Sequence, residues 1–193
     1  GKDRTVKQCL QDMAMHKVDI SQGAVLEKSC VYIVPLQESL ALPDTLQAAG
    51  NPKSSTGRID VFTRLITDYG VEFEQVPAGY TGPLYAEIAP LTFSVLVRTG
   101  SRLSQLRIRS GKATIDKQSH YDLQLKERLV DANLSMQDVR NGVPVSVDLA
   151  GEGEDRLVGF RAKRHSGVVD VDKPGAHPYL EFCLLYTSDA ADE

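Results

Sequence analysis

Cysteine is scarce and scattered in this sequence, and long apolar runs are missing from it. The three cysteines, Cys9, Cys30 and Cys183, lie far apart. They form no disulfide framework, so they fit a reducing compartment. No apolar run approaches the roughly 20 residues of a membrane-spanning helix, and no signal-peptide pattern opens the chain. These absences predict a cytoplasmic protein without a membrane partner.

An excess of positive charge is missing as well. The formal net charge is −4 and the isoelectric point lies near 5.6. The chain therefore has no overall basic field with which to hold a nucleic-acid polymer, whereas a single nucleotide needs only a local positive pocket. With 193 residues and 41% hydrophobic content, the chain can build one domain, or one domain and part of another, around an apolar core.

Short runs of β-branched residues recur along the chain, separated by turns rich in glycine and proline. This pattern predicts an all-β fold, either a sandwich, a jelly roll or a distorted barrel. Residues 59–66 fit a short helix or strands equally well, because so few residues carry no clear periodicity. A polar helix is expected at residues 118–130. Strands are expected at residues 24–27, 31–36, 46–50, 71–76, 84–88, 93–97, 103–108, 144–149 and 156–160.

Residues 51–60 read Asn-Pro-Lys-Ser-Ser-Thr-Gly-Arg-Ile-Asp and form the most distinctive stretch. Between Lys53 and Arg58 the chain combines two cations, three hydroxyl groups and a glycine. A loop of this kind offers backbone N–H groups, hydroxyl donors and positive charge to an anion, most naturally a phosphate. The spacing matches neither a Walker loop nor a dinucleotide fingerprint. A solvated polar turn is the alternative interpretation.

The string Lys-Ser-Ser-Thr-Gly-Arg resembles the Arg-Ser-Ser-x-Gly-Arg motif of deoxycytidine triphosphate (dCTP) deaminases and trimeric deoxyuridine triphosphatases. Residues 51–64 are most similar to the long, two-domain bacterial form of the deaminase. The resemblance implies a dUTPase-like distorted β-barrel or jelly roll, with residues 53–58 at one rim. It also implies dCTP and dUTP as ligands and a homo-oligomer as the assembly.

The same resemblance predicts how the chain is divided. Residues 1–116 are expected to be a dUTPase-like β domain with a truncated N-terminus, and residues 117–142 a helical connector. Residues 143–182 would begin a second, related β domain, because Pro-Val-Ser-Val-Asp-Leu at 144–149 resembles the opening strand of these deaminase domains. Residues 183–193 resemble a translated sequencing-adapter remnant, so we expect a non-native tail there that does not pack.

Hydrolytic removal of an amine needs an activated water and a group that moves protons. Many nucleobase deaminases use zinc bound through a His/Cys-x-Glu and a Pro-Cys-x-x-Cys motif. Neither motif occurs, and the four histidines show no ligand spacing, so the sequence excludes a zinc deaminase. Glu87 is the candidate proton shuttle instead. Alternation places Tyr85 and Glu87 on one strand face. A strand carboxylate more often faces solvent, but the resemblance implies a catalytic role here.

The resemblance assigns roles to further residues. Ser54 and Arg58 would lie beside the reacting water, where Ser54 orients the water and Arg58 holds Glu87. These three residues are expected to converge in one pocket. Lys53, Ser55 and Gly57 would line the phosphate tail, the glycine permitting close backbone approach.

Five more residues complete the expected binding site: two have an open alternative, and three act through the backbone. Tyr80 would pack on the deoxyribose, or else be a turn aromatic that caps the barrel. Gln105 would bind phosphate, or else be structural at a strand end. The backbone of residues 73–76 would contact the pyrimidine edge, through Phe73, Gln75 and Val76.

One position separates deaminase from triphosphatase. The triphosphatases carry a catalytic aspartate where this chain has Pro77, and proline cannot act as a base. We therefore expect hydrolysis of dCTP to dUTP and ammonia without zinc, with Mg²⁺ accompanying the triphosphate. A dUTP pyrophosphatase or bifunctional enzyme, and a non-catalytic nucleotide-binding half of a duplicated enzyme, remain the alternatives.

Overall fold

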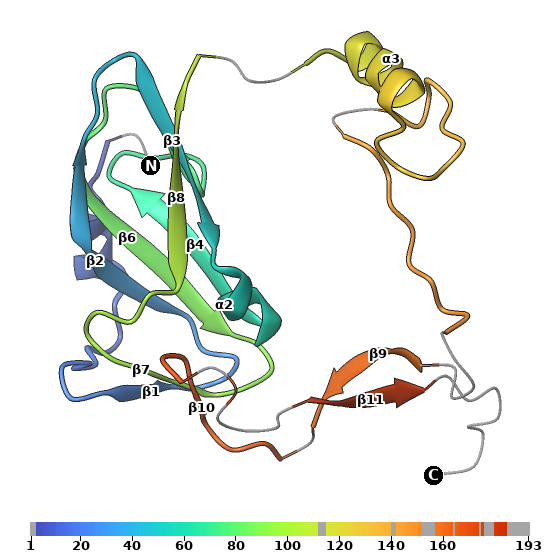
Figure 1. Cartoon of the computed structure of the whole chain (residues 1–193). Coiled ribbons are helices and arrows are strands. Elements are labelled where there is room, and N and C mark those ends of the chain that lie inside the picture. Colours follow the sequence, from blue (N-terminus) through green and yellow to red (C-terminus); the bar gives the residue numbers. More distant parts are fainter. Residues whose placement is uncertain are drawn as a thin grey trace. The chain divides into compact units, whose positions relative to one another are not determined.

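The computed structural model describes residues 3–111, 115–139, 142–151, 157–163, 165–173, 175 and 180–184. The chain divides into two compact units. The first comprises Gly1–Gly111 and Ala162–Glu181, and the second comprises Lys112–Arg161 and Phe182–Glu193. Strands dominate the described residues, with few helices (Figure 1). The expectation of an all-β chain is confirmed at this level; no closed barrel occurs within the described part of the chain.

The central sheet of the first unit is antiparallel and has the strand order β2-β6-β4. Its strands lie side by side in Figure 1 and run across the middle of the unit. A register shift interrupts the β2–β6 pairing between Pro35 and Ser39. The bounds are β2 Tyr32–Ala41, β4 Val61–Thr67 and β6 Thr81–Pro90.

Two smaller sheets complete the first unit. One has the order β5-β3-β8 and is antiparallel throughout. The other has the order β1-β7-β10, in which β10 pairs parallel with β7 although it comes far later in the chain. The bounds are β1 Ala24–Leu26, β3 Leu46–Pro52, β5 Gln75–Val76, β7 Val95–Val97, β8 Ser104–Ser110 and β10 Val169–Asp170.

Alternation along β4 explains where the core lies. Val61, Thr63 and Leu65 are buried, whereas Phe62 and Arg64 point to the opposite face. The buried face therefore belongs to the core and the other face remains partly open. One apolar cluster contains Leu26, Ile59, Val61, Ala86, Ile88, Phe93, Val95, Val97, Leu103 and Val169. A second contains Ala48, Leu65, Val76, Tyr80 and Leu84.

Two helices belong to the first unit. Helix α1 spans Val6–Met13 in a segment for which the sequence made no prediction. A capping box starts it: the Thr5 hydroxyl accepts from the Gln8 N–H at 3.2 Å, and the Gln8 side chain accepts from the Thr5 N–H at 2.9 Å. Helix α2 is a single short turn at Ser54–Arg58, between β3 and β4 (Figure 1).

The second unit contains helix α3, Lys117–Glu127, which confirms the polar helix expected at 118–130. The Asp116 side chain caps its start by accepting from the Ser119 N–H at 2.9 Å. The buried side chain of Gln124 holds the residues that follow the helix. Its amide group donates to the Val130 carbonyl and accepts from the Val130 N–H. Strands β9 Leu157–Ala162 and β11 Leu180–Leu184 form a two-stranded sheet.

Several sequence-based expectations need correction. Residues 144–149 are not a strand, and residues 71–74 are turns that leave only β5 as strand. Both segments alternate apolar residues. No described strand pairs with residues 144–149, and a strand needs a partner for its backbone groups. In residues 71–74, the positive φ of Glu74 (66°) interrupts the extended backbone before β5. Residues 61–67, for which helix and strand were both left open, are a strand. Strand β11 includes Cys183 and Leu184, which we had assigned to the tail, and residues 185–193 lie outside the described residues.

Candidate functional site

The segment that carries the Ser-Ser-Thr-Gly-Arg motif is a helical turn, not the expected loop. The carbonyl oxygen of Leu103, the residue before β8, anchors this turn. This oxygen accepts from the Lys53 N–H at 2.8 Å and from the Thr56 hydroxyl at 2.9 Å. Thr56 is only 2% exposed. One of the three hydroxyl groups of the motif therefore serves the fold, and the remaining two are on Ser54 and Ser55.

The other side chains of α2 lie at its surface. Ser54, Gly57 and Arg58 are exposed, whereas Lys53 and Ser55 are half-buried. A Cβ atom added at Gly57 would meet no atom within 4 Å. The chain itself therefore gives no packing reason for glycine here. The open space is compatible with the close approach of a ligand, which stays a prediction.

Gln105 lies beside the start of α2. It sits opposite Asn51 in the β3–β8 register, and its side-chain amide donates to the Pro52 carbonyl at 3.4 Å. Arg107, two residues further along the same strand, donates to the Asn51 side chain at 2.9 Å. The fold thus brings Gln105 close to Lys53, as a shared phosphate site would require. The phosphate role of Gln105 itself stays a prediction.

Glu87 lies on β6 directly opposite Arg64 on β4. The Arg64 guanidinium donates to the Glu87 carboxylate atom Oε1 through Nε, at 2.9 Å, and also through Nη2. The Glu87 side chain is 14% exposed and that of Arg64 is 31% exposed. The structure differs here from the expectation that Arg58 holds Glu87. Among the described residues, Arg58 makes no hydrogen bond to Glu87, because it lies on α2 rather than on the adjacent strand.

Two aromatic rings surround the guanidinium of Arg64. Its Cζ atom lies 3.6 Å from the centroid of the Phe73 ring and 5.0 Å from that of Phe62. Phe73, an expected pyrimidine-site residue, is thereby connected to Glu87 through Arg64. Sequence reasoning missed Arg64. Its position in the apolar alternation of residues 61–67 was visible, but the register that sets it opposite Glu87 was not.

A second carboxyl group, that of Glu74, lies close to Arg64. Glu74 Oε1 accepts from the Leu65 N–H at 3.2 Å, and Oε2 is buried without a hydrogen-bond partner among the described residues. Burial raises the pKa of Glu74, while the Leu65 N–H and the Arg64 cation act in the opposite direction. A Cβ atom on Gly50 would come within 2.6 Å of Glu74 Oε2. Glycine at residue 50 therefore makes room for this carboxyl group.

Of the remaining expected site residues, Tyr80 and Val76 have buried side chains, and Gln75 is exposed. Tyr80 is 9% exposed; its hydroxyl donates to the Pro83 carbonyl at 2.5 Å and accepts from the Asp68 N–H at 3.2 Å. Of its two interpretations, this favours the structural one. Val76 is 2% exposed in the same core cluster. Gln75 is exposed, and β5 pairs with Ala48 and Ala49 of β3.

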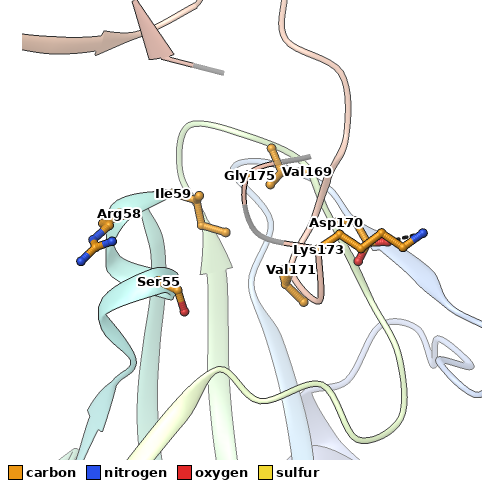
Figure 2. A pocket seen from close by; sticks show the side chains of 8 residues that line it. All are labelled: Ser55, Arg58, Ile59, Val169, Asp170, Val171, Lys173 and Gly175. Carbon is orange, nitrogen blue, oxygen red and sulfur yellow. Dashed lines mark ion pairs between the residues drawn. The ribbon is translucent and has the colours of Figure 1, made fainter. Parts of the chain in front are cut away.

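A pocket of about 180 Å³ adjoins α2, residues 169–173 and Gly175 (Figure 2). Ile59 points towards that segment, and the guanidinium of Arg58 points away from it (Figure 2). Ser54 and Glu87 do not line this pocket, so the expected convergence with Arg58 stays a prediction. The lining residues are Ser55, Arg58, Ile59, Val169, Asp170, Val171, Lys173 and Gly175.

An ion pair between Arg98 and Asp170 holds strand β10 and the residues that follow it in place. Arg98 donates to both carboxylate oxygens of Asp170, each at 2.9 Å. The hydrogen bonds from Arg98 hold the pKa of Asp170 at about 2. Asp172 accepts from Arg98 at 3.2 Å and from the Ser101 hydroxyl at 2.7 Å. This network attaches residues 169–172 to the end of β7 and so shapes one wall of the pocket.

Neither metal clusters nor membrane helices occur in the part of the chain that the structure describes. No group of three or more His, Cys, Asp or Glu side chains there could hold a metal ion. No helix among the described residues has the length and apolar character to cross a bilayer.

Comparisons with known proteins complete this description. Residues 1–112 match the model of the 2'-deoxycytidine 5'-triphosphate deaminase N-terminal domain, and residues 116–190 match that of the C-terminal domain. A crystal structure of 2'-deoxycytidine 5'-triphosphate deaminase from Agrobacterium tumefaciens is similar over 97% of this chain, with 49% identity and a TM-score of 0.84. The match covers 56% of that protein. A comparison with curated proteins finds no match.

Proposed function

This chain belongs to the 2'-deoxycytidine 5'-triphosphate deaminase family, and on that premise we propose that the intact protein converts dCTP and water into dUTP and ammonia. Water would add to C4 of cytosine, and the bond from C4 to the exocyclic nitrogen would break. The proton lost by the water would reach the leaving amine through Glu87.

The observation that carries this proposal is the environment of Glu87. Its carboxylate is largely buried, and Arg64 occupies only one of its two oxygens. A carboxylate held in this way keeps a second oxygen with which to accept and return a proton. Ser54 and Arg58 would contact the reacting water. Lys53, Ser55, Gly57 and Gln105 would bind the phosphate groups.

The remaining features of the proposal concern fold, metal and assembly. We expect the strands to complete a dUTPase-like distorted barrel or jelly roll in a cytoplasmic homo-oligomer. Mg²⁺ would accompany the triphosphate. Because the described residues offer no metal-binding cluster, phosphate oxygens and water would coordinate this ion, and Lys53 would bind the complex through phosphate.

Product analysis of the intact natural protein tests the function. Incubation with dCTP should release ammonia and dUTP, and a zinc chelator should leave the rate unchanged. Pyrophosphate released from dUTP would favour the triphosphatase or bifunctional alternative, which Pro77 argues against. Nucleotide binding without either product would identify a non-catalytic nucleotide-binding half.

A further inference from the structure

We propose that Arg64 is a positioning residue for the proposed general acid–base Glu87. Arg64 would hold the carboxylate by Oε1 and leave Oε2 available for proton transfer. This inference rests on the deaminase function proposed above and adds a residue outside the Ser-Ser-Thr-Gly-Arg motif.

The hydrogen-bond pattern is the first support. Both donating nitrogens of Arg64, Nε and Nη2, go to the same oxygen of Glu87. An arginine can instead bind a carboxylate through two parallel bonds, one to each oxygen, as Arg98 binds Asp170. Glu87 Oε2 accepts no hydrogen bond from the residues that the structure describes. The two carboxylates therefore differ: both oxygens of Asp170 accept a hydrogen bond from arginine, whereas only one oxygen of Glu87 does.

The aromatic contacts are the second support. Phe73 and Phe62 are 43% and 48% exposed, so neither ring is packed into the core. They contact the planar guanidinium instead, the Phe73 ring at 3.6 Å from its Cζ atom. Stacking limits the rotation of the guanidinium, so the hydrogen-bonded oxygen is held in a defined place.

The burial of the Glu87 side chain is the third support. This side chain is 14% exposed, and Arg64 is the cation with which it forms an ion pair. Without Arg64, a largely buried carboxylate would remain without its ion pair. Desolvation would then favour movement of the Glu87 side chain from its place on β6 towards solvent.

The test compares Arg64→Gln, Arg64→Lys and Glu87→Gln in the intact protein by steady-state ammonia release over a range of dCTP concentrations. Arg64→Gln should lower kcat about 10²-fold, the loss typical of a misplaced catalytic group, while KM changes less than about threefold. Arg64→Lys should recover part of this loss, since an ammonium group still reaches one oxygen. In the Glu87→Gln background, Arg64→Gln should add no further loss. Arg109→Gln, on exposed β8, is the matched arginine control.

Two results would overturn the inference: an unchanged kcat in Arg64→Gln, or an equal loss in both backgrounds. A crystal structure of Arg64→Gln decides the point without activity. Its Glu87 carboxylate should move away from the wild-type position, and an unmoved carboxylate would refute positioning by Arg64. If the wild-type protein releases no ammonia, the proposed function fails, and the crystal structure still tests the role of Arg64.

Discussion

Arg64 and Glu87 face each other across the β4–β6 ladder, and two guanidinium nitrogens donate to a single carboxylate oxygen. The pair lies on the face of the central sheet opposite to the core residues Leu65 and Ala86. Its geometry follows from strand register, since neighbouring strands place directly opposed side chains within contact distance. A rigid sheet therefore holds the proposed proton shuttle, rather than a loop.

Replacing Glu87 by glutamine should abolish most of the proposed deamination while the nucleotide still binds. Glutamine keeps the side-chain shape and an oxygen that Arg64 can contact, but it cannot carry the proton. We expect the rate to fall by at least about 10²-fold. Ammonia release and isothermal titration with dCTP measure the two effects. Glu72→Gln, on an exposed turn, is the control, and an unimpaired Glu87→Gln enzyme would make Glu87 structural.

Replacing Lys53 by alanine should have the opposite effect. Affinity for dCTP should weaken by about 1–3 kcal/mol, the usual cost of losing a charge-assisted contact, with little change in kcat. Because the backbone N–H of Lys53 makes the contact with Leu103, the truncated side chain leaves α2 anchored. Lys28→Ala, at an exposed turn, is the matched control. Equal affinities for dCTP in the wild type and Lys53→Ala would contradict the phosphate role.

Replacing Thr56 by valine tests the anchoring of α2. Valine keeps the volume of the buried side chain but loses the bond to the Leu103 carbonyl, which still accepts from the Lys53 N–H. We expect the free energy of unfolding in urea to fall by about 1 kcal/mol. Thr56→Ser keeps the hydroxyl and serves as the comparison. A valine variant as stable as the wild type would mean that the hydroxyl contributes nothing.

Replacing Asp170 by asparagine should give a pH-dependent loss of stability. The pKa of Asp170 falls from its ordinary value of 3.8 to about 2 in the folded protein. The ion pair with Arg98 therefore stabilises the fold above pH 4 and loses this effect as the pH falls through about 2. Urea unfolding should show the largest difference between wild type and Asp170→Asn at pH 6–7 and a shrinking difference towards pH 3. A difference independent of pH would refute the assignment.

Local sequence patterns predicted much of the fold and could not predict pairing. Runs such as Val95–Val97 and Leu46–Pro52 are strands, as their β-branched or turn-bounded composition indicates. Residues 144–149 have the same composition and are not a strand. What differs is the availability of a partner strand, which depends on residues far away in the sequence. Helix α2 was missed because a single turn of five residues has no measurable periodicity.

In the candidate site, too, local sequence patterns identified some residues, whereas others could be recognised only from strand pairing. Residue types and resemblance identified Glu87 and the motif at 53–58, since these are local in sequence. Arg64 lies 23 residues from Glu87, so only the register of the β4–β6 ladder reveals their relationship. Tyr80 carried two interpretations, a contact with the sugar and a structural role at a turn, and its hydroxyl bonds to Asp68 and Pro83 favour the structural one. Aromatic residues at turns look alike in sequence whether they pack inwards or bind a ligand.

The parallel pairing of β10 with β7 has a consequence for synthesis of the protein. Strand β7 ends at Val97, and its neighbour Val169 leaves the ribosome about 70 residues later. At the usual 5–20 residues per second, this edge of β7 waits roughly 4–14 s for its partner. During that interval the growing chain exposes an unpaired strand and the core surface that Val169 later covers. An unpaired strand edge can pair with another chain, so this window is one in which nascent chains can associate through β7.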